Sequence, residues 1–251
     1  MGETPEIVVV VGSAPDATRV TTLPEGQYWL VSVNNAYRLT DRFHFSCFSG
    51  DFPGKSDGLP HLVRNFISEN EYIVALNAFG GLTMCGATMS LASAYWAIHA
   101  LRPPVLAFLG CDMVYGAGQT HFYGTGAPDP LRIDPTLRDL FAKSCRQQAI
   151  AAIEGTHVVN LSLLPESRLA APRLDASRLG NADAVLSLAA RALARGDEAI
   201  ANALQILDDE RAAPFDTGMT DYMHLMQDEA SLRFIDDIDR RWREWGRRFI
   251  G

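Results

Sequence analysis

The sequence predicts an α/β fold: a doubly wound, mostly parallel sheet followed by a helical C-terminal extension. Short apolar runs alternate with helical patterns along most of the chain, which is typical of a parallel sheet covered by helices. The strand runs are continuously apolar, as expected for strands that are buried on both faces. After about Asp183 only helical patterns remain. We therefore predict a Rossmann-like domain at residues 1–182 and a helical extension packed on it at residues 183–251.

The first strand is expected at residues 7–11, which are all apolar. The strand at residues 105–109 is bounded by Pro103-Pro104 and by Gly110, which interrupt regular structure on both sides. Similar runs give the other strands, at residues 28–33, 43–48, 72–76 and 157–161.

Helical patterns are clearest at residues 87–101 and 136–154, and the extension adds helices at 184–207 and 228–249 with a loop at 214–218. The last helix carries an apolar stripe at three- and four-residue spacing. The stripe consists of Leu232, Ile235, Ile238, Trp242, Trp245 and Phe249. We expect it to pack on the core, and a homo-oligomer formed through this helix is the alternative.

Composition and charge argue against several classes of protein. The formal net charge of −8 disfavours nucleic acid as a partner, because phosphate neutralisation requires clustered Lys and Arg. The apolar runs fall far short of the ~20 residues of a membrane span, and the N-terminus lacks the features of a secretory signal. The cysteines form no CxxC pair, which favours reduced thiols over zinc ligands or disulfides. We expect a cytoplasmic protein without a membrane span.

Small and polar residues follow the first three strands, at the sheet edge where α/β proteins bind ligands. Gly12 and Ser13 allow backbone N–H groups to approach a ligand closely. Asn34 and Asn35 suit hydrogen bonds to a base or ribose, and Asp51 adds an acid to the same edge. Turn formation and helix capping would also explain these residues. We predict that all five contact a nucleotide.

A Gly-rich segment at residues 77–90 leads from the expected fourth strand into a helix. The N-terminus of that helix offers unpaired N–H groups and a positive dipole end, so residues 83–88 suit a phosphate or carboxylate. Close packing of the helix on the sheet is the alternative explanation. Cys85 has no base nearby in the sequence and is interpreted as a small core residue rather than a nucleophile.

The loop after residues 105–109 carries the strongest candidates for catalysis, Asp112, Tyr115, His121 and Tyr123. His121 lies between aromatic residues in a Gly-rich loop, and a neutral imidazole can take a proton from a hydroxyl nucleophile. The two tyrosines could donate hydrogen bonds to phosphate oxygens or could cover the core. A structural role remains the alternative for the histidine.

Three basic residues follow this loop. Arg132, Lys143 and Arg146 are candidate contacts for the anionic part of a substrate. The alternative is that they are ordinary solvated charges on a helix surface.

The order of these motifs resembles the bacterial family 42 sialyltransferases. It is also similar to the related domain of motility-associated glycosyltransferases that modify flagellin, and to archaeal-type 6-hydroxymethylpterin diphosphokinases. The resemblance covers roughly residues 7–162. It rests on Gly12-Ser-Ala-Pro-Asp16, Asn34-Asn35, Cys85-Gly86-Ala87, Gly110-Cys-Asp112-Met-Val-Tyr115 and the later His121.

The sialyltransferase resemblance implies a CMP-activated nonulosonate donor, a metal-independent inverting displacement and His121 as the base. It also implies that Tyr115 and Tyr123 lie near the phosphate. The residues implied around the nucleotide are Gly12, Ser13, Asn34, Asn35, Cys85 and Gly86. The family's Gly-x-Gly-Pro-Ser turn is Gly-Ser-Ala-Pro-Asp here, which places the carboxylate of Asp16 near an anionic donor.

Three hypotheses follow. The first is a glycosyltransferase that moves a sugar from a nucleotide donor to a hydroxyl of a glycan or glycoconjugate, without a cofactor or metal. The second is magnesium-dependent pyrophosphoryl transfer from ATP to a pterin-like alcohol, with Asp51 and Asp112 as the acids nearest to that role. The third is a non-catalytic nucleotide-binding protein that assembles through the last helix.

Overall fold

The computed structural model describes residues 5–53, 63–115, 118–124, 132–192 and 196–250. The strands of these residues form one six-stranded sheet in the order β4-β3-β2-β1-β5-β6, and every pair of neighbours is parallel. The strands are β1 (Ile7–Val11), β2 (Tyr28–Val33), β3 (Phe45–Cys47), β4 (Phe66–Ile67), β5 (Val105–Leu109) and β6 (His157–Asn160).

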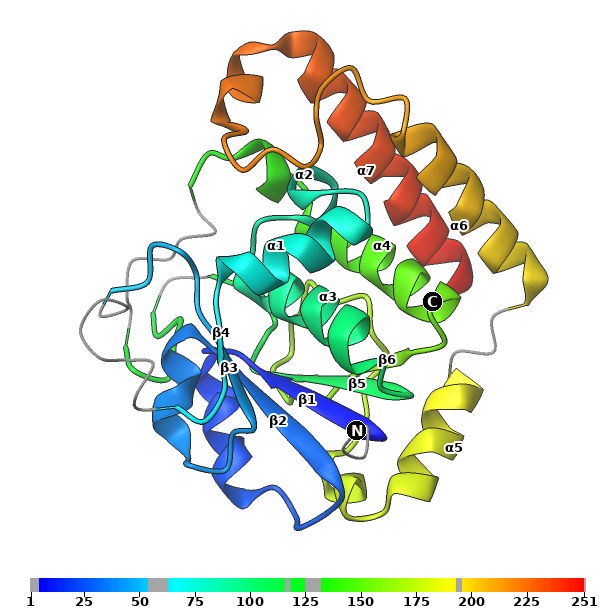
Figure 1. Cartoon of the computed structure of the whole chain (residues 1–251). Helices are drawn as coiled ribbons and strands as arrows, with labels where there is room; N and C mark the ends of the chain where they lie inside the picture. Colours follow the sequence, from blue (N-terminus) through cyan, green and yellow to red (C-terminus); the bar gives the residue numbers. More distant parts are fainter. Residues whose placement is uncertain (1–4, 54–62, 116–117, 125–131, 193–195, 251) are drawn as a thin grey trace.

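Helices cover both faces of this sheet (Figure 1). The α-helices are α1 (Glu69–Ala78), α2 (Leu82–Cys85), α3 (Met89–Leu101), α4 (Leu140–Ile153), α5 (Ala182–Ala192), α6 (Asp197–Glu210) and α7 (Glu229–Phe249). Short 3₁₀ segments lie at Pro15–Thr22, Asn34–Leu39, Pro135–Leu137, Ala176–Gly180 and Met223–Gln227.

Alternate side chains of each strand enter different cores. Val8 and Val10 of β1 face the core formed with α1, α3 and part of α4. Ile7 and Val9 face the opposite core, which includes the 3₁₀ segment after β1 and Val185 of α5. Each face of the sheet is therefore buried, and the predicted doubly wound, parallel α/β fold is confirmed (Figure 1).

The strand order creates a switch point between β1 and β5. The chain runs outward from β1 through β2, β3 and β4, then returns to place β5 on the other side of β1 and continues to β6. The segments after β1 and β5 consequently lead to opposite faces of the sheet, the first to the 3₁₀ segment Pro15–Thr22 and the second to α4. In open α/β sheets the preferred location of a ligand is at such a switch point, outside the carboxyl ends of the strands.

One predicted strand is wrong. Residues 72–76 lie inside helix α1, and the fourth strand is the two-residue β4. Ser68 caps this helix: its hydroxyl accepts from Asn70 N (3.2 Å) and the Glu71 carboxylate accepts from Ser68 N (2.8 Å). A short apolar run cannot distinguish a strand from a buried helix, whereas this capping box specifies a helix.

The helix predicted at residues 184–207 is instead two helices with different neighbours. Helix α5 packs on the sheet through Val185, which is fully buried. Helix α6 begins after Gly196, whose extended backbone (ψ 163°) forms its N-cap, and packs on α4 and α7 instead. The extension is thus confirmed as helical, with its first helix completing the cover of the sheet.

Most of the apolar stripe of α7 is buried within the chain: Ile235, Ile238, Trp242 and Trp245 are buried, and Leu232 and Phe249 are half-buried. Trp242 is 0% exposed and donates its indole N–H to Glu210 of α6 (2.6 Å). Trp245 is 3% exposed and donates to the carbonyl of Ala199 (2.9 Å). These two tryptophans pack with α4 and α6 and form part of the core of the extension.

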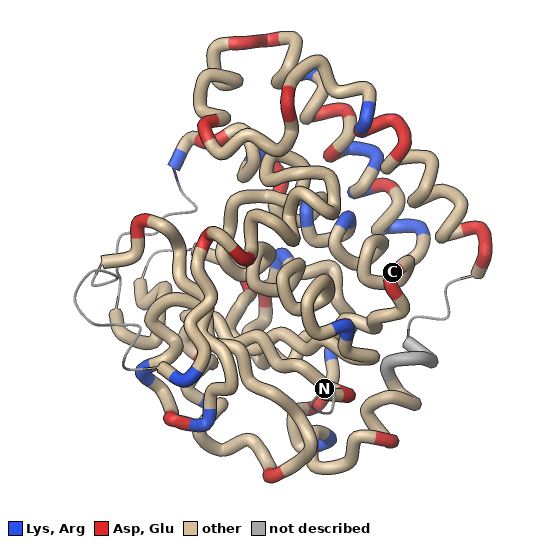
Figure 2. The backbone as a smooth tube through the Cα atoms, in the orientation of Figure 1, with Lys and Arg blue, Asp and Glu red and all other residues tan. Residues whose placement is uncertain are grey.

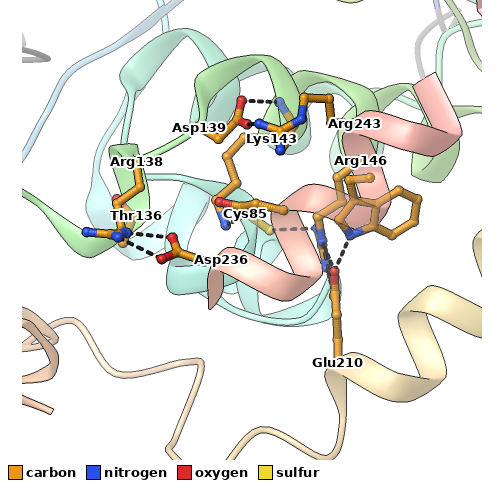
Figure 3. Close-up of polar contacts among 12 residues, drawn as sticks. Cys85, Thr136, Arg138, Asp139, Lys143, Arg146, Glu210, Asp236 and Arg243 are labelled. Atoms are coloured by element: carbon orange, nitrogen blue, oxygen red, sulfur yellow. Dashed lines mark hydrogen bonds and ion pairs between the residues drawn. The ribbon is translucent and has the colours of Figure 1, made fainter. Parts of the chain in front are cut away.

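Two buried ion pairs fasten α4 to this extension, and Figure 3 shows the one between Arg146 and Glu210. Arg146 of α4 contacts Glu210 of α6 (Nη2 to Oε2, 2.7 Å), and both side chains are at most 5% exposed. Lys143 lies 2.9 Å from Asp239 of α7, and these side chains are at most 3% exposed. A buried charge without its partner is costly, so these pairs define how the extension sits on α4.

Most of the other charged side chains lie on the surface, and Asp112 and Asp134 are buried exceptions. Helix α6 carries only Asp and Glu, at its two ends, whereas Arg alternates with Asp and Glu along α7 (Figure 2). Within the described residues, every helix is too short or too polar to cross a membrane. All four cysteines are buried and none forms a disulfide.

Candidate functional site

A cavity of about 450 Å³ lies at the switch point. It is formed by the turns after β1, β2, β3 and β5 together with the start of α3. Its lining includes eight of the residues singled out in the sequence. They are Gly12, Ser13, Asn34, Asn35, Asp51, Tyr115, His121 and Tyr123. The topology therefore brings together residues that are far apart in the sequence, such as Gly12 and Tyr123.

The floor of the cavity is made by the close approach of the β1 and β5 turns. Gly12 N donates to Leu109 O and Ala14 N donates to Gly110 O, both at 2.9 Å. A Cβ at Gly12 would lie 2.3 Å from Gly110 O, and Gly110 itself has φ +66°. Only glycine fits at Gly12 without moving backbone, which explains the small residues at the end of the first strand.

Gly12→Ala is expected to lower the free energy of unfolding by about 1–3 kcal/mol, because the new methyl group has to displace the β5 turn. Gly180→Ala is the matched control: a Cβ there would lie 3.4 Å or more from its nearest neighbours, which is ordinary contact distance. Urea unfolding of both variants tests the prediction. Equal stability of the two variants would show that the turns are not packed as described.

Asn34 joins the second and third turns. Its backbone has φ +48°, which asparagine tolerates better than most residues. Its side-chain Oδ1 accepts from Ser49 N at 3.0 Å. The amide Nδ2 is then the group of Asn34 left to donate to a ligand, and Asn35 and Asp51 line the same side of the cavity.

The loop that carries His121 is anchored to the first turn. Phe122 N donates to Ser13 O at 2.9 Å. His121 and Gly124 exchange backbone hydrogen bonds of 3.0 and 3.1 Å, and Gly124 closes this turn with φ +127°. The loop thereby holds the imidazole against the cavity.

Aromatic rings and a hydroxyl surround the imidazole of His121. The ring stacks on Tyr123, with centroids 4.9 Å apart and planes at 20°, and lies 6.0 Å from the ring of Tyr115. Nδ1 shares a 2.9 Å hydrogen bond with the hydroxyl of Thr120. When Nδ1 carries the proton, Nε2 presents a lone pair, as a general base requires.

Partial burial lowers the pKa of His121 below its usual value of 6.5. Desolvation penalises the charged imidazolium, so the ring is neutral at physiological pH. A neutral imidazole beside two phenol groups can accept a proton from a hydroxyl, while the phenols donate hydrogen bonds to an anionic group.

Helix α3 directs its N-terminus at the cavity. Thr88 caps the helix by accepting from Leu91 N at 3.3 Å, and Thr88, Met89 and Ser90 line the cavity. The N-terminus of this 13-residue helix provides N–H donors and a positive dipole end for an anion. The sequence predicted this anion site at residues 83–88, whereas in the structure residues 88–90 line the cavity. The capping threonine was the signal for the correct position.

Cys85 and Gly86 do not line this cavity. Because α1 replaces the expected fourth strand, the Gly-rich segment begins at the end of a helix and not at the edge of the sheet. Cys85 is fully buried, its Sγ accepts from Arg146 Nη1 at 3.4 Å, and burial raises its pKa to about 11. A Cβ at Gly86 would meet the stem of Lys143 at 3.2 Å. Both residues contribute to packing against α4.

Asp112 is buried beside β6 and is not part of the cavity lining. Asn160 Nδ2 lies 3.4 Å from Asp112 Oδ1, and the backbone carbonyl of Asp112 accepts from Arg168 N at 2.9 Å. Burial raises the pKa of Asp112, and the hydroxyls of Ser162 and Ser167 oppose this effect. In this position Asp112 holds the turn after β5.

The three candidate anion contacts are also placed elsewhere. Lys143 and Arg146 are the cations of the two buried ion pairs, so their charges are directed into the interior (Figure 3). Arg132 lines a second cavity next to the first, where its Nε lies 2.9 Å from Asp134 Oδ2.

Among the described residues, no group of three or more His, Cys, Asp or Glu side chains is arranged to hold a metal ion. No protein-family model, curated protein or solved structure matches this chain.

Proposed function

We propose that the protein is a glycosyltransferase that moves a sugar from a nucleotide donor to a hydroxyl of a glycan or glycoconjugate. The observation that supports this proposal is the shared cavity at the switch point. Backbone donors of the β1 turn, the amides of Asn34 and Asn35, the N-terminus of α3 and the imidazole of His121 all line it.

The lining suits a nucleotide with few phosphates. The asparagine amides offer donors and acceptors for a base or ribose. The α3 N-terminus and the hydroxyls of Ser13, Tyr115 and Tyr123 supply neutral donors for a phosphate. No Lys or Arg occurs among the described lining residues, so a single phosphate, as in a CMP-sugar, fits better than a triphosphate.

His121 acts as the general base in this proposal. As the sugar C–O bond to the donor phosphate breaks, the acceptor oxygen forms a new bond to the same carbon and its proton passes to Nε2 of His121. The nucleotide leaves with the electron pair of the broken bond, and Tyr115 and Tyr123 donate hydrogen bonds to its phosphate. A CMP-linked nonulosonate is the donor that the motif resemblance favours.

The pH dependence of turnover follows from the environment of His121. Its pKa lies below 6.5, and the base is active only when neutral. We expect kcat/KM to stay constant down to about pH 6.5 and then to fall about tenfold per pH unit below the lowered pKa. A pH–rate profile that declines already above pH 7 on its acid side would assign the base to another group.

Magnesium-dependent pyrophosphoryl transfer has less structural support. That reaction needs carboxylates that hold the metal against the phosphates. Asp51 lines the cavity, but Asp112 is buried beside β6.

A transfer assay tests the proposal. Purified protein is incubated with CMP-, UDP- or GDP-linked sugars and a mixture of oligosaccharides, and release of the free nucleotide is followed with and without acceptor. Acceptor-dependent release from one donor is expected. Product formation only from ATP, magnesium and a pterin alcohol would replace the proposal with the second hypothesis.

A further inference from the structure

A further cavity, of about 320 Å³, lies at the amino end of β2. Its lining includes Glu25, Tyr28, Leu30, Arg42, His44 and Arg64, and we call it the arginine pocket. Tyr28 is the first residue of β2, whereas Asn34 of the first cavity follows the last residue of the same strand. The described linings of these two cavities have no residue in common. The arginine pocket is therefore distinct from the cavity at the switch point.

Two cations and one carboxylate line the arginine pocket. In the part of the chain that the structure describes, Arg42 and Arg64 form no ion pair, whereas most arginines of α7 are paired with a carboxylate. Both arginines act on His44, since their charges lower its pKa. Glu25 is the acid of the described lining and offsets one of the two positive charges. The pocket therefore has a net positive charge in a chain with a formal net charge of −8.

The guanidinium group of Arg42 is held in place by neutral partners. Its Nη2 donates to the hydroxyl of Tyr28 at 2.8 Å, and its Nη1 donates to the carbonyl of Leu23 at 3.5 Å. The guanidinium carbon lies 5.9 Å from the centre of the Tyr28 ring, and the Tyr28 hydroxyl donates to the carbonyl of Pro24. A guanidinium has five N–H donors, so these contacts leave donors for a ligand. Because the group is already positioned, binding costs less side-chain entropy.

His44 adds a neutral donor to the same pocket. Its Nδ1 accepts from Leu30 N at 3.2 Å, and its ring stacks on Trp29 with centroids 5.5 Å apart. A backbone N–H can only donate, so Nδ1 carries the lone pair and Nε2 carries the proton. Burial and the two arginines lower the pKa of His44, which keeps the ring neutral at physiological pH. The Nε2–H group is thus a hydrogen-bond donor that accompanies the two cations.

We propose that the arginine pocket binds the phosphate group of a small phosphorylated ligand. Arg42 and Arg64 donate charge-assisted hydrogen bonds to the phosphate oxygens, and His44 Nε2 donates a further one. Guanidinium N–H groups match pairs of phosphate oxygens, which favours phosphate over a smaller anion. A volume of about 320 Å³ lies at the lower end of the range of small-molecule sites, so a small organic group fits beside the phosphate. The proposal does not depend on the glycosyltransferase function.

Three anions test the proposal on the wild-type protein: glycerol 3-phosphate, inorganic phosphate and acetate. Each is titrated at constant ionic strength, and backbone amide shifts in NMR spectra locate where it binds. We expect glycerol 3-phosphate to shift the amides of Leu30 and His44 and to bind there at least as tightly as inorganic phosphate. Acetate is expected to bind more weakly, since it has one negative charge and two oxygens. No saturable shift at these amides, binding of inorganic phosphate alone, or equal binding of acetate would overturn the proposal.

Arg64→Gln assigns the binding to the pocket. Arg64 is exposed, so its replacement should leave the fold intact. The variant is expected to bind glycerol 3-phosphate at least about tenfold more weakly at these amides, because a hydrogen bond to a charged group is lost. Arg247→Gln is the matched control: it removes the same charge from an exposed arginine of α7 and should keep the affinity. Unchanged affinity in Arg64→Gln, or an equal loss in Arg247→Gln, would contradict the proposal.

Glu25→Gln should have the opposite effect. Removal of this carboxylate from the pocket is expected to tighten the binding of glycerol 3-phosphate about twofold or more, because like charges no longer repel. A damaged pocket would bind more weakly, so tighter binding separates the effect of charge from a loss of structure. Weaker or unchanged binding in this variant would contradict the proposal. The affinity for CMP is expected to stay the same in Arg64→Gln, since the first cavity has a different lining.

Discussion

Arg146→Met is expected to lower the free energy of unfolding by about 3–5 kcal/mol, the cost of removing one partner from a buried ion pair. Arg146 is 1% exposed and directs Nε and Nη2 to the Glu210 carboxylate at 2.7–3.1 Å. Its Nη1 donates to the hydroxyl of Tyr95 at 3.0 Å. Methionine would leave the Glu210 carboxylate buried, and among the described residues its remaining partner would be the indole N–H of Trp242.

The matched control is Arg138→Met, on the segment leading into α4. Arg138 pairs with Asp236 of α7 at 2.7 Å, but the side chains are 36% and 49% exposed. An exposed pair contributes about 0–1 kcal/mol, so this variant should be nearly as stable as wild type. Urea unfolding compares the two. Similar losses in both variants would mean that burial of the Arg146 pair does not determine how the extension is held.

His121→Ala is expected to reduce turnover by about 10²–10⁴-fold while the nucleotide still binds, because a general base contributes that much to the chemical step. Steady-state kinetics gives the turnover, and calorimetry gives the nucleotide affinity. Loss of turnover with unchanged nucleotide affinity distinguishes a base from a residue that only shapes the cavity, because a change in the shape of the cavity would weaken nucleotide binding as well.

His224→Ala is the control for this prediction. His224 is exposed, lies in the 3₁₀ segment Met223–Gln227 and lines neither cavity. Its replacement should leave turnover unchanged. Full activity of His121→Ala would remove the imidazole from the mechanism. Asp51, the carboxylate that lines the same cavity, would then be the next candidate for the proton acceptor.

The fold was predictable where apolar runs were continuous. Strands β1, β2 and β5 begin and end where the sequence placed them, because a parallel strand buried on both faces needs such a run. The error at residues 72–76 has the opposite cause. Helix α1 is buried on one side, through Tyr72, Ala75 and Leu76. An apolar run of five residues is compatible with either structure until the capping box at Ser68 is considered.

The site was predictable to the extent that it follows from topology. Residues after consecutive strands converge because the strands are parallel, which is why Gly12, Asn34 and His121 line one cavity. The destinations of Lys143 and Arg146 were not predictable, since their partners lie far along the chain at Asp239 and Glu210. The second cavity combines α1 with a segment near the C-terminus, a juxtaposition that no local pattern encodes.

The most direct test of the nucleotide site is a thermal-shift measurement with CMP, CDP, UDP, GDP, ADP and ATP, each with and without magnesium. A ligand that binds the folded state increases the free energy of unfolding, by about 2.7 kcal/mol at a hundred times its Kd, and thereby raises the melting temperature. We predict that CMP or CDP raises it without magnesium in the wild type and raises it less in Asn35→Ala, which removes one amide from the cavity. No shift with any nucleotide would contradict the assignment of this cavity.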